Sequence, residues 1–333
     1  MGDVKISALP SASSANSTDI LPADQSGTTR GVTVAQLQTA VFTTPVQSSY
    51  EDFTAIADPS APSSGHVRIY GKQVAGRILP KWIGPSGINT QFQAALDGNS
   101  VVMWLPGTST TAAINFGTSW SITTTQATPA IAATSLMTSI KRATFTTTTT
   151  AGSGSGVRSA APVAVYSGST TTAGQAGFFL AMRFGVLTYT STMRILMGMS
   201  STTTALGSTD PSAGYADLIA ITKDAADSAW QGTTSAGAGT FTKNTSGHTV
   251  AASSNTDCFD FFAFNPDDGS GHIWLRLVDI GNNTVYLNDV AASGNLPRAG
   301  ALLTVQAACS NSAGGAGSAV AIWLSKIYIE CDN

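Results

Sequence analysis

The sequence predicts a mostly β protein, and three observations lead to this fold class. Charged residues make up only 11% of the 333 residues, against about 25% in an average soluble protein. Hydrophobic residues make up 42%, which is enough for a sizeable core. Short apolar runs alternate with clusters of Gly, Pro, Asn and Asp, the pattern of short strands joined by tight turns. Such a composition argues against helical bundles and coiled coils.

Residues 1–44 are predicted to form a docking segment rather than a folded domain. A turn is expected at Gln25-Ser26-Gly27, followed by a short helix that Thr33 and Gln36 cap. A helix of about eight residues does not persist alone in water, so its apolar stripe needs a partner. The apolar residues assigned to docking are Ile6, Leu9, Ile20, Leu21, Val34 and Leu37.

The stretch from Lys5 to Gln38, KISALP followed by TDILPADQSGTTRGVTVAQLQ, resembles the amino-terminal segment of fibre and appendage proteins of tailed bacteriophages. In that family the segment attaches the protein to the virion and leads into a trimeric body. The resemblance therefore implies a virion location, a homotrimer, and docking on other virion proteins. It does not distinguish tail from head. Met1–Pro22 lacks the apolar core of a signal peptide, so we expect synthesis in the cytoplasm of the host bacterium.

Residues 45–110 are predicted to form a small β-rich connector module. Asp58–Pro62 resembles a stiff linker, and His66–Gly84 has the pattern of strands and a hairpin. A short helix is expected at Asn89–Leu96. Ser100–Leu105 (SVVMWL) has the pattern of a buried strand, stopped by Pro106 and Gly107.

Four basic residues lie in this module without an acidic residue between Asp58 and Asp97: Arg68, Lys72, Arg77 and Lys81. They form either an ordinary solvated hairpin face or a contact for an acidic neighbour in the virion. Nucleic acid is not an expected partner, because the net charge is −3 and no aromatic stacking motif accompanies the basic residues.

Residues 111–333 are predicted to form an antiparallel β-sandwich of the jelly-roll type, with a Ser/Thr/Gly-rich lead-in at 111–160. The lead-in contains AGSGSG (Ala151–Gly156), which is typical of a flexible linker. Strand patterns alternate with turn clusters over the rest of this range. In HIWLRLVDI, Ile273, Leu275 and Leu277 share one face, and Trp274, Arg276 and Val278 share the other.

The strand patterns of the last 190 or so residues, which end in AIWLSKIYIE, resemble those of concanavalin-like lectin jelly rolls. In phage fibres such domains often lie at the tip and contact the host surface. The resemblance implies contact with host surface polysaccharide.

Chemistry-bearing motifs are scarce. The three histidines are widely spaced, without the HExxH or HxH pattern of a zinc site. No phosphate-binding loop and no GxSxG nucleophile motif occurs. We therefore expect no catalytic residue, no metal and no cofactor. Calcium remains an alternative to turn chemistry at Asp267-Asp268-Gly269 and at Asp257 and Asp260. Cys258, Cys309 and Cys331 are expected to be buried thiols.

Exposed aromatic rings pack on sugar faces, and neighbouring Asp side chains bond the hydroxyls. Trp230 with Asp227, in the loop-like KDAADSAWQG, and Tyr215 after Asp210-Pro211 are therefore the candidate glycan-binding residues. The aromatic residues in strand patterns are expected in the core instead: Trp274, Trp323 and Tyr328.

Three functions follow. The leading hypothesis is a trimeric tail fibre or receptor-binding protein that attaches the virion to host glycans. The alternative is a capsid decoration or head-fibre protein without a receptor role, and the third is a sugar-cleaving enzyme. Residues 1–200 carry a net charge of +4 and residues 201–333 one of −7, which suits halves with different partners. Membrane insertion is not expected, because the uncharged stretch Gly98–Ile140 is too rich in Ser and Thr.

Overall fold

The computed structural model describes residues 20–25, 28–33, 53–74, 77–85, 89–91, 99–107, 114–124, 126–171, 176–251, 258–291, 294–311 and 318–332. The chain divides into two units, Met1–Phe53 and Thr54–Asn333. In the first unit, β1 (Ile20–Gln25) pairs antiparallel with β2 (Thr28–Thr33), on either side of the predicted turn.

Two of the predicted docking residues, Ile20 and Leu21, begin β1. The other four lie outside the described residues: Ile6, Leu9, Val34 and Leu37. Thr33, the expected helix cap, is the last residue of β2, and the remainder of the predicted helix also lies outside the described residues.

The connector module contains a three-stranded antiparallel sheet of β3 (Arg68–Val74), β4 (Arg77–Ile83) and β5 (Asn89–Gln91). The β3–β4 pair confirms the predicted hairpin. The helix predicted from Asn89 is wrong at its start, because Asn89–Gln91 pairs with Lys81–Ile83 instead. An available strand edge outweighs the helical pattern of so short a segment.

Three of the basic residues of the hairpin are bound to groups of the module or buried in it. Lys72 forms an ion pair with Asp58 at 2.7 Å, and Arg68 donates to the carbonyl and hydroxyl oxygens of Ser60. Lys81 is buried. Burial alone would raise the pKa of Asp58, but hydrogen bonds from Lys72 and Tyr70 lower it below its usual value. The hairpin is therefore not a uniformly solvated basic face.

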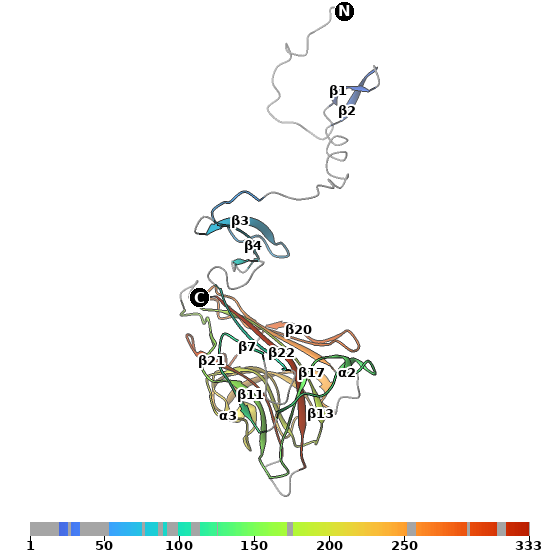
Figure 1. Cartoon of the computed structure of the whole chain (residues 1–333). Coiled ribbons are helices and arrows are strands. Elements are labelled where there is room, and N and C mark those ends of the chain that lie inside the picture. Colours follow the sequence, from blue (N-terminus) through green and yellow to red (C-terminus); the bar gives the residue numbers. More distant parts are fainter. Residues whose placement is uncertain are drawn as a thin grey trace, which may run out of the picture. The chain divides into compact units, whose positions relative to one another are not determined.

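The remainder of the second unit is a sandwich of two antiparallel sheets (Figure 1). The first has nine strands, in the order β20 (Thr284–Ala291), β19 (Trp274–Asp279), β18 (Phe259–Asn265), β13 (Phe178–Thr188), β22 (Ala321–Asp332), β10 (Ala143–Thr146) and β9 (Gln126–Ala127), with β6 (Asn99–Leu105) on β22 and β7 (Ile114–Phe116) on β6. The second has eight, in the order β17 (Thr240–Thr249), β16 (Ala229–Gly237), β15 (Ile219–Lys223), β14 (Arg194–Ser200), β21 (Leu302–Ser310), β11 (Gly154–Ser159) and β8 (Trp120–Thr123), with β12 (Ala164–Val165) on β21.

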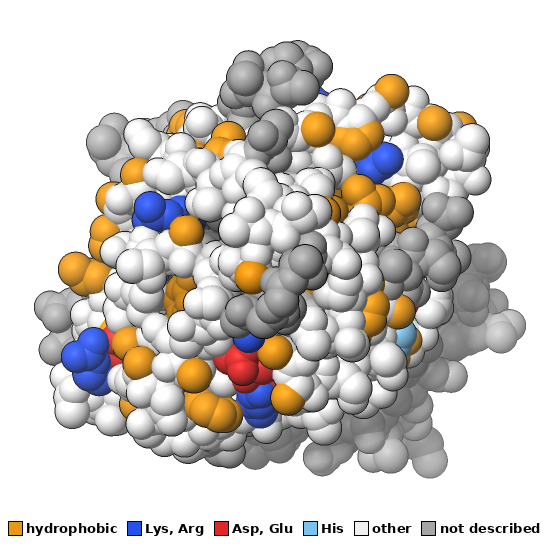
Figure 2. All heavy atoms as spheres, turned by 90° about the horizontal axis from the view of Figure 1, so that it is seen from below, with side chains coloured by type: hydrophobic (Ala, Val, Ile, Leu, Met, Phe, Trp, Pro, Cys, Tyr) orange, Lys and Arg blue, Asp and Glu red, His pale blue; other side chains and the backbone are white. Residues whose placement is uncertain are grey.

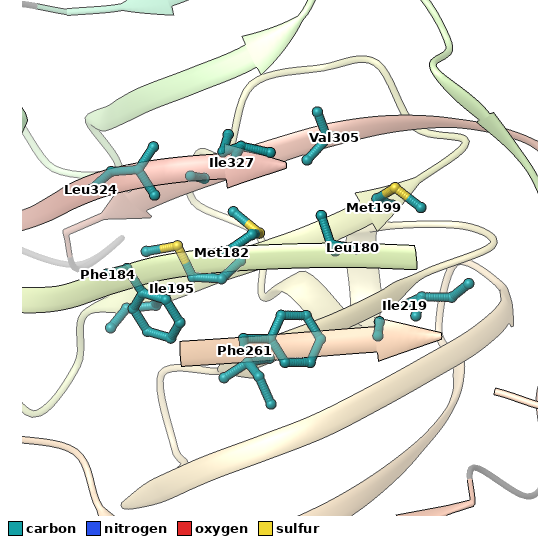
Figure 3. Close-up of a cluster of buried hydrophobic side chains, with 14 of the residues drawn as sticks. Leu180, Met182, Phe184, Ile195, Met199, Ile219, Phe261, Val305, Leu324 and Ile327 are labelled. Atoms are coloured by element: carbon teal, nitrogen blue, oxygen red, sulfur yellow. The ribbon is translucent and has the colours of Figure 1, made fainter. Parts of the chain in front are cut away.

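The main core lies between these two sheets. Strand alternation places Leu180, Met182 and Phe184 of β13 inward, where they meet Ile195 of β14 and Ile219 of β15 (Figure 3). All five side chains are buried. Because each strand contributes every second residue to this layer, the intervening residues point outward from the sandwich.

The sandwich begins earlier in the sequence than the predicted boundary at residue 111. The predicted strand at Ser100–Leu105 is present as β6, but it pairs with β22 along Ile327–Asp332 and belongs to the nine-stranded sheet. Its side chains Val102 and Trp104 are part of the main core. The physical reason is that the SVVMWL pattern alternates correctly for a sheet covered on its inner face.

The AGSGSG stretch is not a flexible linker throughout. Its last three residues begin β11, which pairs with β21 and β8. A side chain at Gly154 would collide with the carbonyl oxygen of Leu206, and one at Gly156 would collide with that of Ala307. Glycine is needed at both positions because neighbouring backbone approaches closely.

The outer face of the eight-stranded sheet is covered by a segment of this chain. Leu206, Tyr215 and Leu218 from the segment 201–218 pack with Leu196, Ala220 and Ala308 of the sheet. This segment contains the short helix α3 (Pro211–Gly214), whose first residue is a proline. Asp217 ties the segment down, because its buried carboxylate accepts from Arg298 and Ser201.

The outer face of the nine-stranded sheet is covered at one end by a short helix. There α2 (Leu136–Ser139), capped by the Ser135–Thr138 capping box, places Met137 against Cys258 and Trp323. Away from α2, several apolar side chains of this sheet remain open to solvent, among them Phe179 and Trp274.

One face of the molecule shows how small the charged share of its surface is. Figure 2 shows mostly uncharged polar side chains and backbone, with acidic and basic groups in a few small clusters. Among the described residues, no helix is long and apolar enough to cross a membrane.

Candidate functional site: an aromatic row on the nine-stranded sheet

Three aromatic residues form a row across the outer face of the nine-stranded sheet. Phe264 of β18 is directly paired with Trp274 of β19 on one side and with Phe179 of β13 on the other. We call these three residues the aromatic row. Trp274 is 38% exposed and Phe179 36%, while Phe264 is half-buried between them.

The row is positioned by strand alternation. Leu275 points into the core from β19, so Trp274, which precedes it in the same strand, points to the outer face. Ala263 is likewise a core residue of β18, and the ring of Phe264, which follows it, lies on the outside. Adjacent strands lie about 4.8 Å apart, which fixes the spacing of the row.

The rings support one another. The centroids of Phe179 and Phe264 lie 6.5 Å apart, and Phe262 stacks on Phe179 at 6.0 Å with an interplanar angle of 27°. The ring of His272 meets that of Trp274 edge-on at 6.2 Å. Ring contacts of this kind stabilise the arrangement of each pair, while strand pairing alone places Trp274 next to Phe264.

Polar side chains lie beside the row and at one of its ends. Arg276 follows Trp274 on the outer face of β19 and donates to Asn288 at 2.7 Å. Glu330 of β22 is directly paired with Phe179 and accepts a hydrogen bond from the hydroxyl of Tyr328 at 2.9 Å. Burial, together with this bond to Glu330, raises the pKa of Tyr328, so its hydroxyl keeps its proton at neutral pH.

An ion pair fixes the next part of the same face. The guanidinium of Arg183 on β13 donates two hydrogen bonds of 2.7 Å to the carboxylate of Asp260 on β18. These bonds raise the pKa of Arg183 above its usual value. The two residues are direct cross-strand partners, so the pair locks the β13–β18 register four residues along both strands from Phe179 and Phe264.

The structure corrects two of the predicted glycan-binding residues. Trp230 is 1% exposed and lies in the main core, where its ring meets Phe184 and Phe259 edge-on at 5.5 and 5.6 Å. Tyr215 is buried in the cluster under segment 201–218, and its hydroxyl donates to the carbonyl of Thr204. Neither ring can contact a sugar, because each is covered by side chains from other parts of the chain.

Asp227, the third predicted residue, is partly buried and already paired. Its carboxylate forms an ion pair with Lys243 of β17 at 2.7 Å, and Asp224 binds the same ammonium at 2.6 Å. Burial alone would lower the pKa of Lys243, but the two carboxylates raise it above its usual value. This cluster connects β17 to the turn after β15. Trp230 lies in the main core, Tyr215 lies in the cluster under segment 201–218 and Asp227 lies in this ion-pair cluster, so the three predicted residues do not form one site.

The prediction for Trp274 was wrong in the opposite sense. Its place in a strand pattern led us to expect it in the core, but it is exposed on the outer face. The alternation of HIWLRLVDI already assigned it to the face opposite Leu275, and that assignment is confirmed. Trp323 is buried as expected, under Met137, and Tyr328 is half-buried.

The described aspartates that were considered for calcium accept hydrogen bonds from backbone amides or pair with Arg183. Asp267 accepts from the amide of Ala176, and Asp268 accepts from that of Ser270 within a turn. Asp260 holds Arg183, and Asp257 lies outside the described residues. Among the residues described, no group of three His, Cys, Asp or Glu side chains could hold a metal ion.

The three cysteines are buried thiols and none of them forms a disulfide, as predicted. Burial raises the pKa of the Cys309 thiol to about 12, so it stays protonated and unreactive at neutral pH.

No protein-family profile matches this chain, and no curated protein matches it in sequence. Solved structures match its fold. A protein of unknown function from Shewanella oneidensis MR-1 aligns with a TM-score of 0.48 and 12% identity, over 72% of this chain and 89% of that one. The carbohydrate recognition domain of Emp47p aligns with a TM-score of 0.41 and 9% identity, over 71% and 98%.

Peanut lectin aligns with a TM-score of 0.39 and 10% identity, over 70% of this chain and 97% of the lectin. At these levels of identity the likeness concerns the fold alone. The strand pairing of the chain itself makes the larger part of the second unit an antiparallel β-sandwich.

Proposed function

We propose that this protein is a trimeric receptor-binding appendage of a bacteriophage virion, and that its sandwich attaches the virion to host surface glycans. The observation that carries the glycan-binding part is the aromatic row, because exposed aromatic rings provide the apolar platform on which a sugar ring packs. As a binding protein it would leave the glycan intact.

Two further features support this function. The amino-terminal stretch from Lys5 to Gln38 resembles a virion-docking segment, and the sandwich follows it in the chain. Glu330, Arg276 and His272 beside the row supply acceptors and donors for sugar hydroxyls. The core of a protein–protein interface is, in contrast, depleted of charged residues.

The first test uses the full chain, because a fragment that begins after residue 107 would lack β6, a partner of β22. The fluorescently labelled protein is applied to a panel of starch, xylan, mannan, β-glucan and bacterial lipopolysaccharides. We expect binding to at least one polysaccharide by the wild type and by Trp82→Ala, and weaker binding by Trp274→Ala. Equal binding by both variants, or none by the wild type, would contradict the glycan-binding role of the row.

Trp82 is a matched control because the residue is 37% exposed, close to the 38% of Trp274, but it lies in the three-stranded sheet. The virion part of the proposal is tested by antibody labelling of intact virions in the electron microscope. Label at the tail supports receptor binding, whereas label over the head would make the protein a capsid decoration.

A further inference from the structure

The aromatic row lies on the outer face of the nine-stranded sheet. Its end members, Trp274 and Phe179, are each more than one-third exposed, and they are separated by one intervening strand. Sites that enclose a small ligand are concave and bury most of its surface. A sugar placed on Trp274 would instead be covered on one side only. The sugars before and after it in a polysaccharide could therefore continue along the sheet.

The row also has a direction. Its members are direct partners on three consecutive strands, so the line through them runs across the strands rather than along one of them. With strands about 4.8 Å apart, the row spans about 10 Å from β19 to β13. A ligand that contacts all three rings must therefore be extended and longer than one sugar.

The polar neighbours lie beside this line and at one of its ends. Arg276 lies next to Trp274 along β19, and Glu330 lies beyond Phe179 on β22. Hydroxyls at the edges of a sugar chain would meet these groups while its apolar faces rest on the rings. Charges of both signs are present, so the surface is not restricted to an anionic chain.

From this geometry we infer that the row binds internal segments of a polysaccharide, laid across β19, β18 and β13, and does not recognise a terminal sugar. The inference rests on the proposed glycan-binding function and specifies its ligand. Since each added sugar meets a further aromatic ring, affinity should grow with the number of sugars until the row is covered. Several copies bound to one polymer would add avidity.

The test is a competition series with the polysaccharide that binds best in the panel. Binding of the full chain to the immobilised polymer is inhibited by its monosaccharide and by size-fractionated oligosaccharides. We expect the monosaccharide to compete weakly, with competition improving by about three- to tenfold for each added sugar over the first few sugars and then levelling off. Enzymatic removal of terminal sugars should leave binding to the polymer unchanged.

Substitutions within the row test whether it is the surface that makes binding depend on oligosaccharide length. Trp274→Ala and Phe179→Ala should each weaken binding of the longer fragments by about three- to tenfold and bring their competition closer to that of the monosaccharide. Trp82→Ala should behave as the wild type. Circular dichroism and thermal unfolding check that all the variants are folded.

Two outcomes would overturn the inference while leaving glycan binding intact: a monosaccharide that competes as well as the longer fragments, or loss of binding after removal of terminal sugars. If no polysaccharide in the panel binds, the proposed function itself fails, and this inference fails with it. The two failures are therefore distinguishable.

Discussion

Arg183 and Asp260 face each other across β13 and β18 and are joined by two hydrogen bonds of 2.7 Å. Asp260 is almost completely buried, whereas the guanidinium remains partly exposed. Removal of Arg183 would leave a carboxylate that neither water nor protein fully solvates. The pair therefore holds together the two strands that carry Phe179 and Phe264.

The first prediction concerns this pair. Arg183→Ala should lower the free energy of unfolding by about 1–3 kcal/mol, because Asp260 keeps its desolvation cost and loses its donors. Asp260→Ala made together with Arg183→Ala should cost less than the sum of the single changes. A double-mutant cycle in urea measures the coupling, and a coupling of zero would show that the pair does not stabilise the β13–β18 contact.

The second prediction concerns the glycines of β11. Gly156→Ala should destabilise the protein by about 1–3 kcal/mol, because the added methyl group meets the backbone of Ala307 and Ala308 and overpacks the sheet. Gly237→Ala is the control, since no atom lies within 4 Å of its added carbon. Thermal unfolding compares the two, and equal midpoints would support the linker interpretation of AGSGSG after all.

The third prediction concerns Asp217, whose backbone has φ of +50° and whose side chain is buried. Asn tolerates this backbone conformation, so Asp217→Asn removes the charge without adding backbone strain. It should lower stability by about 1–3 kcal/mol, because hydrogen bonds from Arg298 to an ionised acceptor are lost. Asp268→Asn, in an exposed turn, is the control and should leave stability unchanged.

The same variant has a pH signature. Burial alone would raise the pKa of Asp217, but the bonds from Arg298 and Ser201 outweigh it and lower the pKa below its usual value of 3.8. The stabilisation by Asp217 is therefore present above pH 3.8 and lost as the pH falls through the lowered value. Acid unfolding curves of wild type and Asp217→Asn should converge in this range. Curves that stay parallel would contradict the assignment.

The fourth prediction concerns Lys223, a buried lysine at the end of β15. Its ammonium donates to the carbonyls of Ser191, Met193 and Asp224 at 2.7, 2.9 and 3.1 Å. Burial nevertheless lowers its pKa from 10.5 to about 8. Between these pH values the unfolded chain binds a proton that the folded protein does not, so raising the pH favours the folded state.

Relative to Lys223→Met, the wild type should therefore gain stability as the pH rises from about 8 to 10.5. Midpoints of urea unfolding for both proteins across this range measure the effect, and the titrating tyrosines cancel because both proteins contain them. A constant difference between the two proteins would show that Lys223 titrates at its ordinary value when folded.

Much of the sandwich could be predicted because alternation is local. HIWLRLVDI and FDFFAF each place their core residues at every second position, and Leu275 and Phe261 lie in the core accordingly. The same reasoning could not decide which outward residues are covered. Trp323 and Trp274 both belong to outward-facing positions of one sheet, but only Trp323 lies under α2.

The candidate site was mispredicted for the same reason. Trp230 and Tyr215 stand among polar neighbours in the sequence, but they are buried together with residues that are distant in the sequence, such as Phe259 for Trp230 and Ala308 for Tyr215. The row is built by the pairing of three strands, and no single stretch of sequence contains it. Its one local signal is Trp274 on the face opposite Leu275.

The most direct test of the central claim compares two tryptophans of nearly equal exposure. Binding isotherms of Trp274→Ala and Trp82→Ala on the best-bound polysaccharide should separate by about three- to tenfold, with Trp82→Ala superimposed on the wild type. Superimposed isotherms for all three proteins would contradict a glycan-binding role for the aromatic row.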